Sequence, residues 1–250
     1  MFKKSLYFAL PAAFALALTG CSGGTETEEG AATSGAAIES IAAPEGQKWS
    51  TTVAQTDAGG YVMGNPEAPI KLVEYMSITC SHCAAFGEEA FNSIRDDYVE
   101  SGRVSFEIRN FVRDPLDLTA AMLSRCGGEG PFFALTKQAL GNQEQMFEKA
   151  QGMGEATYNS ILQSEPKVRF VKLAEELGLI NHFQQLGISE DQAKTCLSKE
   201  ATAEKLMTDT QTAVDQHDIQ GTPTFLLNGK RIDGTNWAMV EAALKEAGAR

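Results

Sequence analysis

Residues 70–83 read IKLVEYMSITCSHC, and this stretch decides the fold. Its first seven residues are mostly apolar and predict a buried strand. Beyond the stretch, residues 84–98 carry apolar side chains at helical spacing, so a strand runs into a helix at Cys80 and Cys83. Residues 104–111 then alternate between apolar and polar side chains, which is the period of a strand. Together these segments predict a β-α-β unit with two cysteines at the strand-to-helix junction.

The flanking sequence completes an α/β fold class. Asn228-Gly229 is the strongest short hairpin signal in the chain and predicts a β-β-α half near the C-terminus. An all-helical insertion separates this half from the β-α-β half. The remaining predicted elements are strands at 49–56, 61–63, 224–227 and 230–232, helices throughout 112–217, and a final helix at 237–244. The predicted domain boundaries are 48–111 and 218–250 for the sheet-containing domain and 112–217 for the insertion.

The N-terminus has the order of a secretory signal. Lys3 and Lys4 precede an apolar run at residues 6–18, which is too short to span a bilayer comfortably. The run ends in Leu-Thr-Gly-Cys, which resembles the lipobox of bacterial lipoproteins. This resemblance implies a lipoprotein signal peptide at residues 1–20 and a lipid on Cys21.

The segment after the signal predicts a compartment. Residues 21–47 are rich in Ser, Gly, Thr, Glu and Ala, a composition that favours a flexible tether behind the lipid anchor. The folded part is then expected on the periplasmic side of a bacterial membrane, inner or outer, where disulfides persist. The net charge of −12 excludes a general nucleic-acid-binding protein, because such a protein needs a basic surface.

Cys80 and Cys83 predict thiol–disulfide exchange. Cys80 precedes the helix, where unpaired backbone N–H groups and the helix dipole favour a thiolate, and His82 can add positive charge. Cys80 is therefore the attacking cysteine and Cys83 the resolving one. Two alternatives stay open: an inert disulfide, and a copper(I)-binding metallochaperone module that uses Cys80, His82 and Cys83. No second Cys-x-x-Cys or His pair accompanies the motif, so neither a structural zinc site nor another cofactor is predicted.

Cys126 and Cys196 form a second candidate pair within the helical insertion. A disulfide between them would close a loop of about 70 residues and stabilise the fold by about 4 kcal/mol in the chain-entropy model. The predicted role is a structural disulfide. A second redox pair that relays electrons to Cys80 and two free buried thiols remain as alternatives.

These motifs together resemble the DsbA-like group of the thioredoxin superfamily. The resemblance rests on the Cys-x-His-Cys centre, the helical insertion and Gly-Thr-Pro-Thr-Phe at residues 221–225, and it covers the chain from about residue 70 onward. It implies a thioredoxin-like fold with Pro223 as a cis-proline facing the disulfide and Thr222 binding the substrate backbone. It also implies that Glu74 is a buried acid assisting proton transfer at Cys83. From the residues alone, Pro223 could be trans and Glu74 could point outward at a sheet edge.

Two departures from the group leave the direction of catalysis open. Ser81 stands where many strong oxidases carry proline, and Thr222 stands where DsbA carries valine. The resemblance favours a monomeric oxidase that acts on exported proteins with cysteine pairs and is served by an unidentified redox partner. The alternatives within the same chemistry are a reductase or an isomerase for a dedicated client.

Overall fold

The computed structural model describes residues 35–250. The predicted signal peptide, residues 1–20, and the predicted lipid-bearing Cys21 lie outside this range. Among residues 35–250, no helix combines the length and apolar character needed to cross a membrane.

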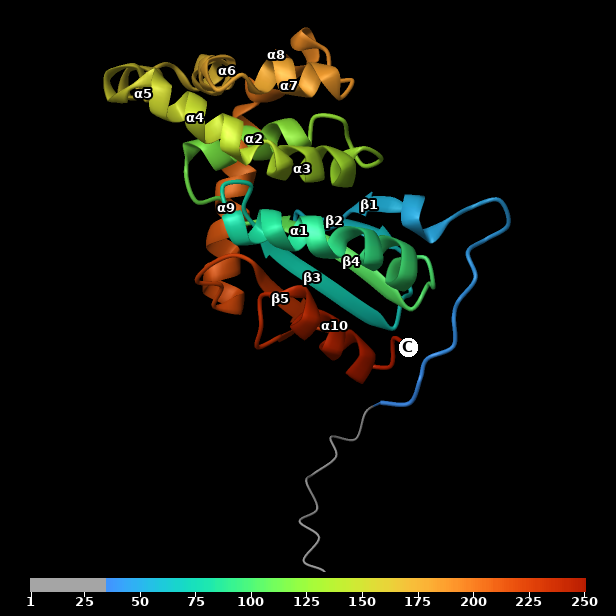
Figure 1. The fold of residues 1–250 in the computed structure, drawn as a ribbon. Coiled ribbons are helices and arrows are strands. Elements are labelled where there is room, and N and C mark those ends of the chain that lie inside the picture. Colours follow the sequence, from blue (N-terminus) through green and yellow to red (C-terminus); the bar gives the residue numbers. More distant parts are fainter. Residues whose placement is uncertain (1–34) are drawn as a thin grey trace, which may run out of the picture. The chain divides into compact units, whose positions relative to one another are not determined.

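A mixed six-stranded sheet forms the centre of the described chain (Figure 1). The strand order is β1-β2-β4-β3-β5-β6, in which β3 and β4 are parallel and every other neighbouring pair is antiparallel. The strands are β1 (Val53–Gln55), β2 (Tyr61–Gly64), β3 (Ile70–Met76), β4 (Val104–Asn110), β5 (Thr224–Leu227) and β6 (Lys230–Arg231).

Helices cover both faces of this sheet. On one face α1 contacts α10, while on the other face α9 contacts β4. Figure 1 shows the helices α2 to α8, coloured from green to orange, gathered above the sheet. The helices are α1 (Ser81–Ser93), which continues as a π-helical segment (Ile94–Val99), α2 (Pro115–Ser124), α3 (Phe132–Gly141), α4 (Gln143–Met153), α5 (Glu155–Leu162), α6 (Pro166–Glu176), α7 (Leu179–Gln185), α8 (Glu190–Leu197), α9 (Glu200–His217) and α10 (Trp237–Glu246).

The central strand β3 is buried on both faces. Its successive side chains alternate between the two faces of the sheet, and each face packs against an apolar cluster. Leu72 joins the main apolar cluster, which also contains Phe86 of α1. Val73 and Tyr75 lie in a second cluster with Ala213 of α9. This double cover explains why β3 is an almost continuous apolar run, and it makes a charged residue within the strand conspicuous.

The predicted thioredoxin-like fold with a helical insertion is confirmed. The β3-α1-β4 unit forms the first half and β5-β6-α10 the second. The predicted strand at 49–56 is wrong at its start, where Trp49–Thr51 form a short 3-10 helix. Trp49 is buried there and its indole N–H donates to the Ile41 carbonyl at 2.7 Å, so side-chain anchoring takes the place of strand pairing.

The structure also differs from the predicted flexible tether over residues 35–47. This segment lies along the folded domain, where the Ile38 N–H donates to the Gly248 carbonyl and the Ile41 N–H to the Ser101 carbonyl, each at 2.9 Å. In Figure 1 the segment is the blue stretch of chain that leads to β1. The composition of this segment is typical of a flexible tether. Composition does not reveal backbone hydrogen bonds to distant parts of the chain, and such bonds hold the segment here.

Candidate active site

Cys80 lies between the carboxyl end of β3 and the first turn of α1, as the residue that caps the helix. Its sulfur accepts a hydrogen bond from the Cys83 backbone N–H at 3.4 Å. The Cys80 sulfur lies 3.2 Å from the Thr222 carbonyl oxygen, to which it donates a hydrogen bond when it is protonated. Cys80 and Cys83 are both free thiols, and both are buried. The structure therefore shows a reduced dithiol at the start of a helix.

The two thiols have opposite acidities. The pKa of Cys80 is lowered to about 5, chiefly by the hydrogen bond from the Cys83 side chain. Burial opposes this effect, and the backbone N–H groups of Cys83 and His82 add to it. The pKa of Cys83 is raised far above its usual range, first by burial and then by its hydrogen bond to Cys80. At neutral pH the pair thus carries one thiolate, on Cys80.

Glu74 lies beneath this pair, on the central strand β3 and away from any sheet edge. Its side chain lines a small cavity of about 20 Å³ that Cys83 also lines, and the residue is 4% exposed. Burial raises the pKa of Glu74 to about 8, and the charge of Cys80 adds to the shift. Glu74 is therefore a protonated acid at neutral pH, and it shares this cavity with Cys83.

Thr222 meets Cys80 from the loop before β5, and Pro223 follows it in the chain. The peptide bond between Thr222 and Pro223 is cis. The Thr222 hydroxyl is buried and has no hydrogen-bond partner among the described residues.

The structure brings Cys80, Cys83, Glu74, Thr222 and Pro223 together but leaves the His82 side chain exposed. His82 acts on Cys80 through its backbone N–H, as a residue of the first helical turn. Within residues 35–250 no three His, Cys, Asp or Glu side chains are close enough to share a metal ion.

Sequence reasoning missed three residues of the insertion that hold the loop before Cys80. Asp117 of α2 accepts the Ile78 N–H at 2.7 Å, and Asp114 accepts the Thr79 hydroxyl at 2.7 Å. Gln143, the first residue of α4, donates from its amide to the Ile78 carbonyl at 2.5 Å and to the Cys80 carbonyl at 2.9 Å.

Only one of these three residues has a recognisable signal in the sequence. Asp114 is recognisable in the sequence as a helix cap before a proline. Asp117 and Gln143 give no such signal, since each is an ordinary polar residue within a helical segment.

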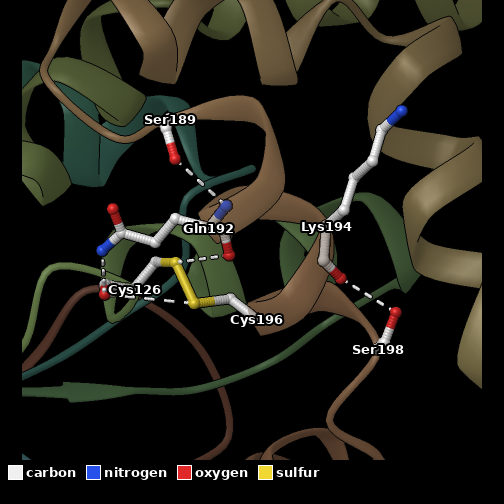
Figure 2. The surroundings of a disulfide bond; sticks show 6 residues. All are labelled: Cys126, Ser189, Gln192, Lys194, Cys196 and Ser198. Atoms are coloured by element: carbon white, nitrogen blue, oxygen red, sulfur yellow. Dashed lines mark hydrogen bonds between the residues drawn. A yellow bond between two sulfur atoms is a disulfide. The ribbon is translucent and has the colours of Figure 1, made fainter.

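Cys126 and Cys196 are joined by a disulfide, remote in sequence from the dithiol (Figure 2). The bond ties the segment after α2 to α8 across a sequence separation of 70 residues. Figure 2 also shows the Gln192 amide donating to the Cys126 carbonyl, at 3.2 Å. The disulfide thus connects an early part of the helical insertion to a late one.

The chain is similar to several known proteins. Residues 56–246 match the model of the thioredoxin family. A solved structure described as a protein-disulfide isomerase from Novosphingobium aromaticivorans is 32% identical, with a TM-score of 0.70 over 74% of this chain and 95% of that one. The structure of a point variant of Wolbachia pipientis α-DsbA1 is 25% identical, with a TM-score of 0.51 over 66% of this chain and 73% of that one.

Curated relatives agree with these matches. A Rickettsia typhi relative, a protein-disulfide oxidoreductase by name, is 27% identical over 191 residues, which are 76% of this chain and 63% of the relative. The matched region thus spans less than two thirds of that relative. Because the family model matches most of the chain and the dithiol, cis-proline and helical insertion all stand in the fold, the chain belongs to the thioredoxin family, as a DsbA-like member.

Proposed function

We propose that the chain is a thiol–disulfide oxidoreductase that works as an oxidase on exported proteins with cysteine pairs. The observation that carries the proposal is the acidity of Cys80, whose pKa is about 5, beside the far less acidic Cys83. A stabilised thiolate is a good leaving group, so a disulfide that releases it is a strong oxidant. The names of the Rickettsia and Novosphingobium relatives support the same chemistry.

The reaction begins with a disulfide between Cys80 and Cys83. A client thiolate attacks the Cys80 sulfur, so that a client–Cys80 bond forms and the Cys80–Cys83 bond breaks. Cys83 leaves as a thiolate and takes a proton from Glu74. The second client thiolate then attacks the client sulfur of the mixed disulfide and releases Cys80 as its stabilised thiolate. Two electrons pass from the client to the enzyme, and a membrane or periplasmic redox partner accepts them in turn.

Further roles in the site follow from position. Thr222 and Pro223 bind the client backbone beside Cys80, where the Thr222 carbonyl lies next to the sulfur. The Cys126–Cys196 disulfide stabilises the insertion and takes no part in electron transfer. The enzyme acts as a monomer on the periplasmic side of a bacterial membrane, held there by a lipid on Cys21.

A second candidate within the same chemistry is disulfide isomerisation. It is favoured by the 32% identical Novosphingobium protein, whose description names that activity. An isomerase attacks a wrong client disulfide with its Cys80 thiolate and re-forms a different one, with no net change in electrons. Refolding of a scrambled-disulfide protein by the reduced enzyme alone would favour this candidate.

The reduction potential of the purified protein tests the proposal. We expect equilibration with glutathione to give a potential above about −200 mV, whereas a value near the roughly −270 mV of thioredoxin would defeat the oxidase function. A Cys83→Ser variant should trap clients as mixed disulfides on Cys80. A Cys80→Ser variant is the matched control and should trap none.

A further inference from the structure

A groove lies on the side of α1 that faces the helical insertion. It runs between α1 and the helices α3 and α4, and its volume is about 600 Å³. Ser81, the residue directly after Cys80 in the chain, is among the residues that line the groove. A volume of this size suits a few side chains of an extended segment.

The floor of the groove is apolar. Leu140 of α3 and Phe147 of α4 form it together with Ala84 of α1. Two glycines, one on α1 and one on α3, keep the floor open. A Cβ at Gly87 would stand 3.4 Å from the Leu140 side chain, and a Cβ at Gly141 would enter space with no atom within 4 Å. The groove therefore offers contact to an apolar side chain.

The rim of the groove is acidic. Glu88, Glu144 and Glu148 line it and are exposed, and none of them forms an ion pair with another described residue. Lys137 is the one cation among the lining residues, and its ammonium lies 5.5 Å from the centre of the Phe91 ring. Three free carboxylates against one ammonium give the rim a negative potential that attracts cationic partners.

We infer that this groove binds the client segment that flanks the reacting cysteine, and that it selects an apolar side chain next to Lys or Arg. The inference rests on the proposed function and names its substrate class. The apolar floor fits side chains that an unfolded client still exposes, and the acidic rim fits basic neighbours. Bound in this way, the client thiolate is delivered to the Cys80 sulfur, and the bonds that form and break are those given above.

Two single-cysteine peptides test the inference on the full soluble protein, oxidised beforehand with oxidised glutathione. Both carry a leucine beside the cysteine; lysines flank it in one peptide and glutamates in the other. The rate of mixed-disulfide formation is divided by the rate with glutathione, so that a general loss of reactivity cancels. We expect the lysine peptide to react about tenfold faster than the glutamate peptide at low salt, and we expect this preference to shrink at high salt.

Variants then locate the preference in the groove. Glu144→Lys combined with Glu148→Lys should abolish or reverse it, whereas Glu45→Lys with Glu246→Lys changes the net charge equally outside the groove and should preserve it. Retention of the tenfold preference in the groove double variant would overturn the inference.

Two glycine substitutions test whether the apolar floor of the groove binds the client segment. Gly141→Leu fills the groove and should lower the normalised rate of the lysine peptide about tenfold, by removing the bound segment's apolar contact. Gly130→Leu is the control, because a Cβ there also meets no atom within 4 Å but lies outside the groove. Equal rates in the two variants would refute the floor as a binding surface. Absence of reaction with glutathione itself would instead overturn the proposed function, and this inference with it.

Discussion

Replacing Glu74 by glutamine tests the buried acid directly. The glutamine keeps the shape of the carboxyl group in the cavity beneath α1 but cannot ionise. In the native protein the pKa of Glu74 is raised from 4.5 to about 8, first by burial and then by the Cys80 charge. The folded state therefore binds this proton more tightly than the unfolded chain does, and the wild-type protein is destabilised wherever the carboxyl is forced to ionise.

The two pKa values fix the size and direction of the effect. The proton contributes fully to stability below pH 4.5, and its contribution is lost as the pH rises toward 8. The difference between these two pKa values lowers the free energy of unfolding of the wild type relative to its value at low pH. The loss is about 1 kcal/mol at pH 5, about 3 kcal/mol at pH 7 and about 5 kcal/mol at pH 9. Because Glu74→Gln removes this titration, the variant should gain stability relative to the wild type by about 4 kcal/mol between about pH 5 and about pH 9.

Urea unfolding of the reduced proteins at several pH values measures this difference. Glu67→Gln, at an exposed loop position, is the matched control and should follow the wild type at every pH. Cys80→Ser removes the thiolate, the second cause of the shift, and should make the pH dependence of stability shallower. Parallel curves for the wild type and Glu74→Gln across this pH range would refute the assignment of Glu74 as a buried, neutral acid.

Three further predictions follow from the contacts around the site. Gln143→Leu removes the amide that fixes the first turn of α1, so the pKa of Cys80 should rise from about 5 to about 6. The ultraviolet absorbance of the thiolate measures this pKa. The control Gln151→Leu, at an exposed position, should leave the pKa unchanged. Replacing Cys126 and Cys196 by serine should lower the free energy of unfolding by about 4 kcal/mol in chemical denaturation without changing the reduction potential, and an altered potential would instead mark a relay pair. Thr222→Val removes a buried, unpartnered hydroxyl and should raise the stability of the substrate-free protein by about 1 kcal/mol, so a loss of stability would show that the hydroxyl has a partner.

Local signals were enough to predict the arrangement of the two halves. Residues 70–83 contain a strand, a junction and a helix start, and the spacing of apolar residues over a short range predicts each of them. The Asn228-Gly229 turn is equally local, because both residues adopt positive φ, 48° and 80°, which this dipeptide tolerates. Such features depend on neighbours a few residues apart, so a single sequence reveals them.

Trp49 and residues 35–47 show where local signals end. The start of the predicted strand has the composition of one, yet the indole of Trp49 binds the Ile41 carbonyl and the backbone turns instead. The segment before it pairs with residues near 101 and 248. Both outcomes are decided by partners outside the local stretch, which propensity and composition do not encode.

Gln143 shows that contacts between distant parts of the chain also affect the acidity of Cys80. Chain order divides the protein into a sheet-containing domain and an insertion, and the reactive cysteines fall in the first. Yet Asp117 and Gln143, both in the insertion, bind the backbone N–H and carbonyl of Ile78, and Gln143 also binds the Cys80 carbonyl. That carbonyl accepts the Ala84 N–H that opens α1, so the amide fixes the turn whose N–H groups stabilise the thiolate. The reactive loop and the insertion therefore form one physical unit, and a mutation in α4 should change the acidity of a cysteine 63 residues away in the chain.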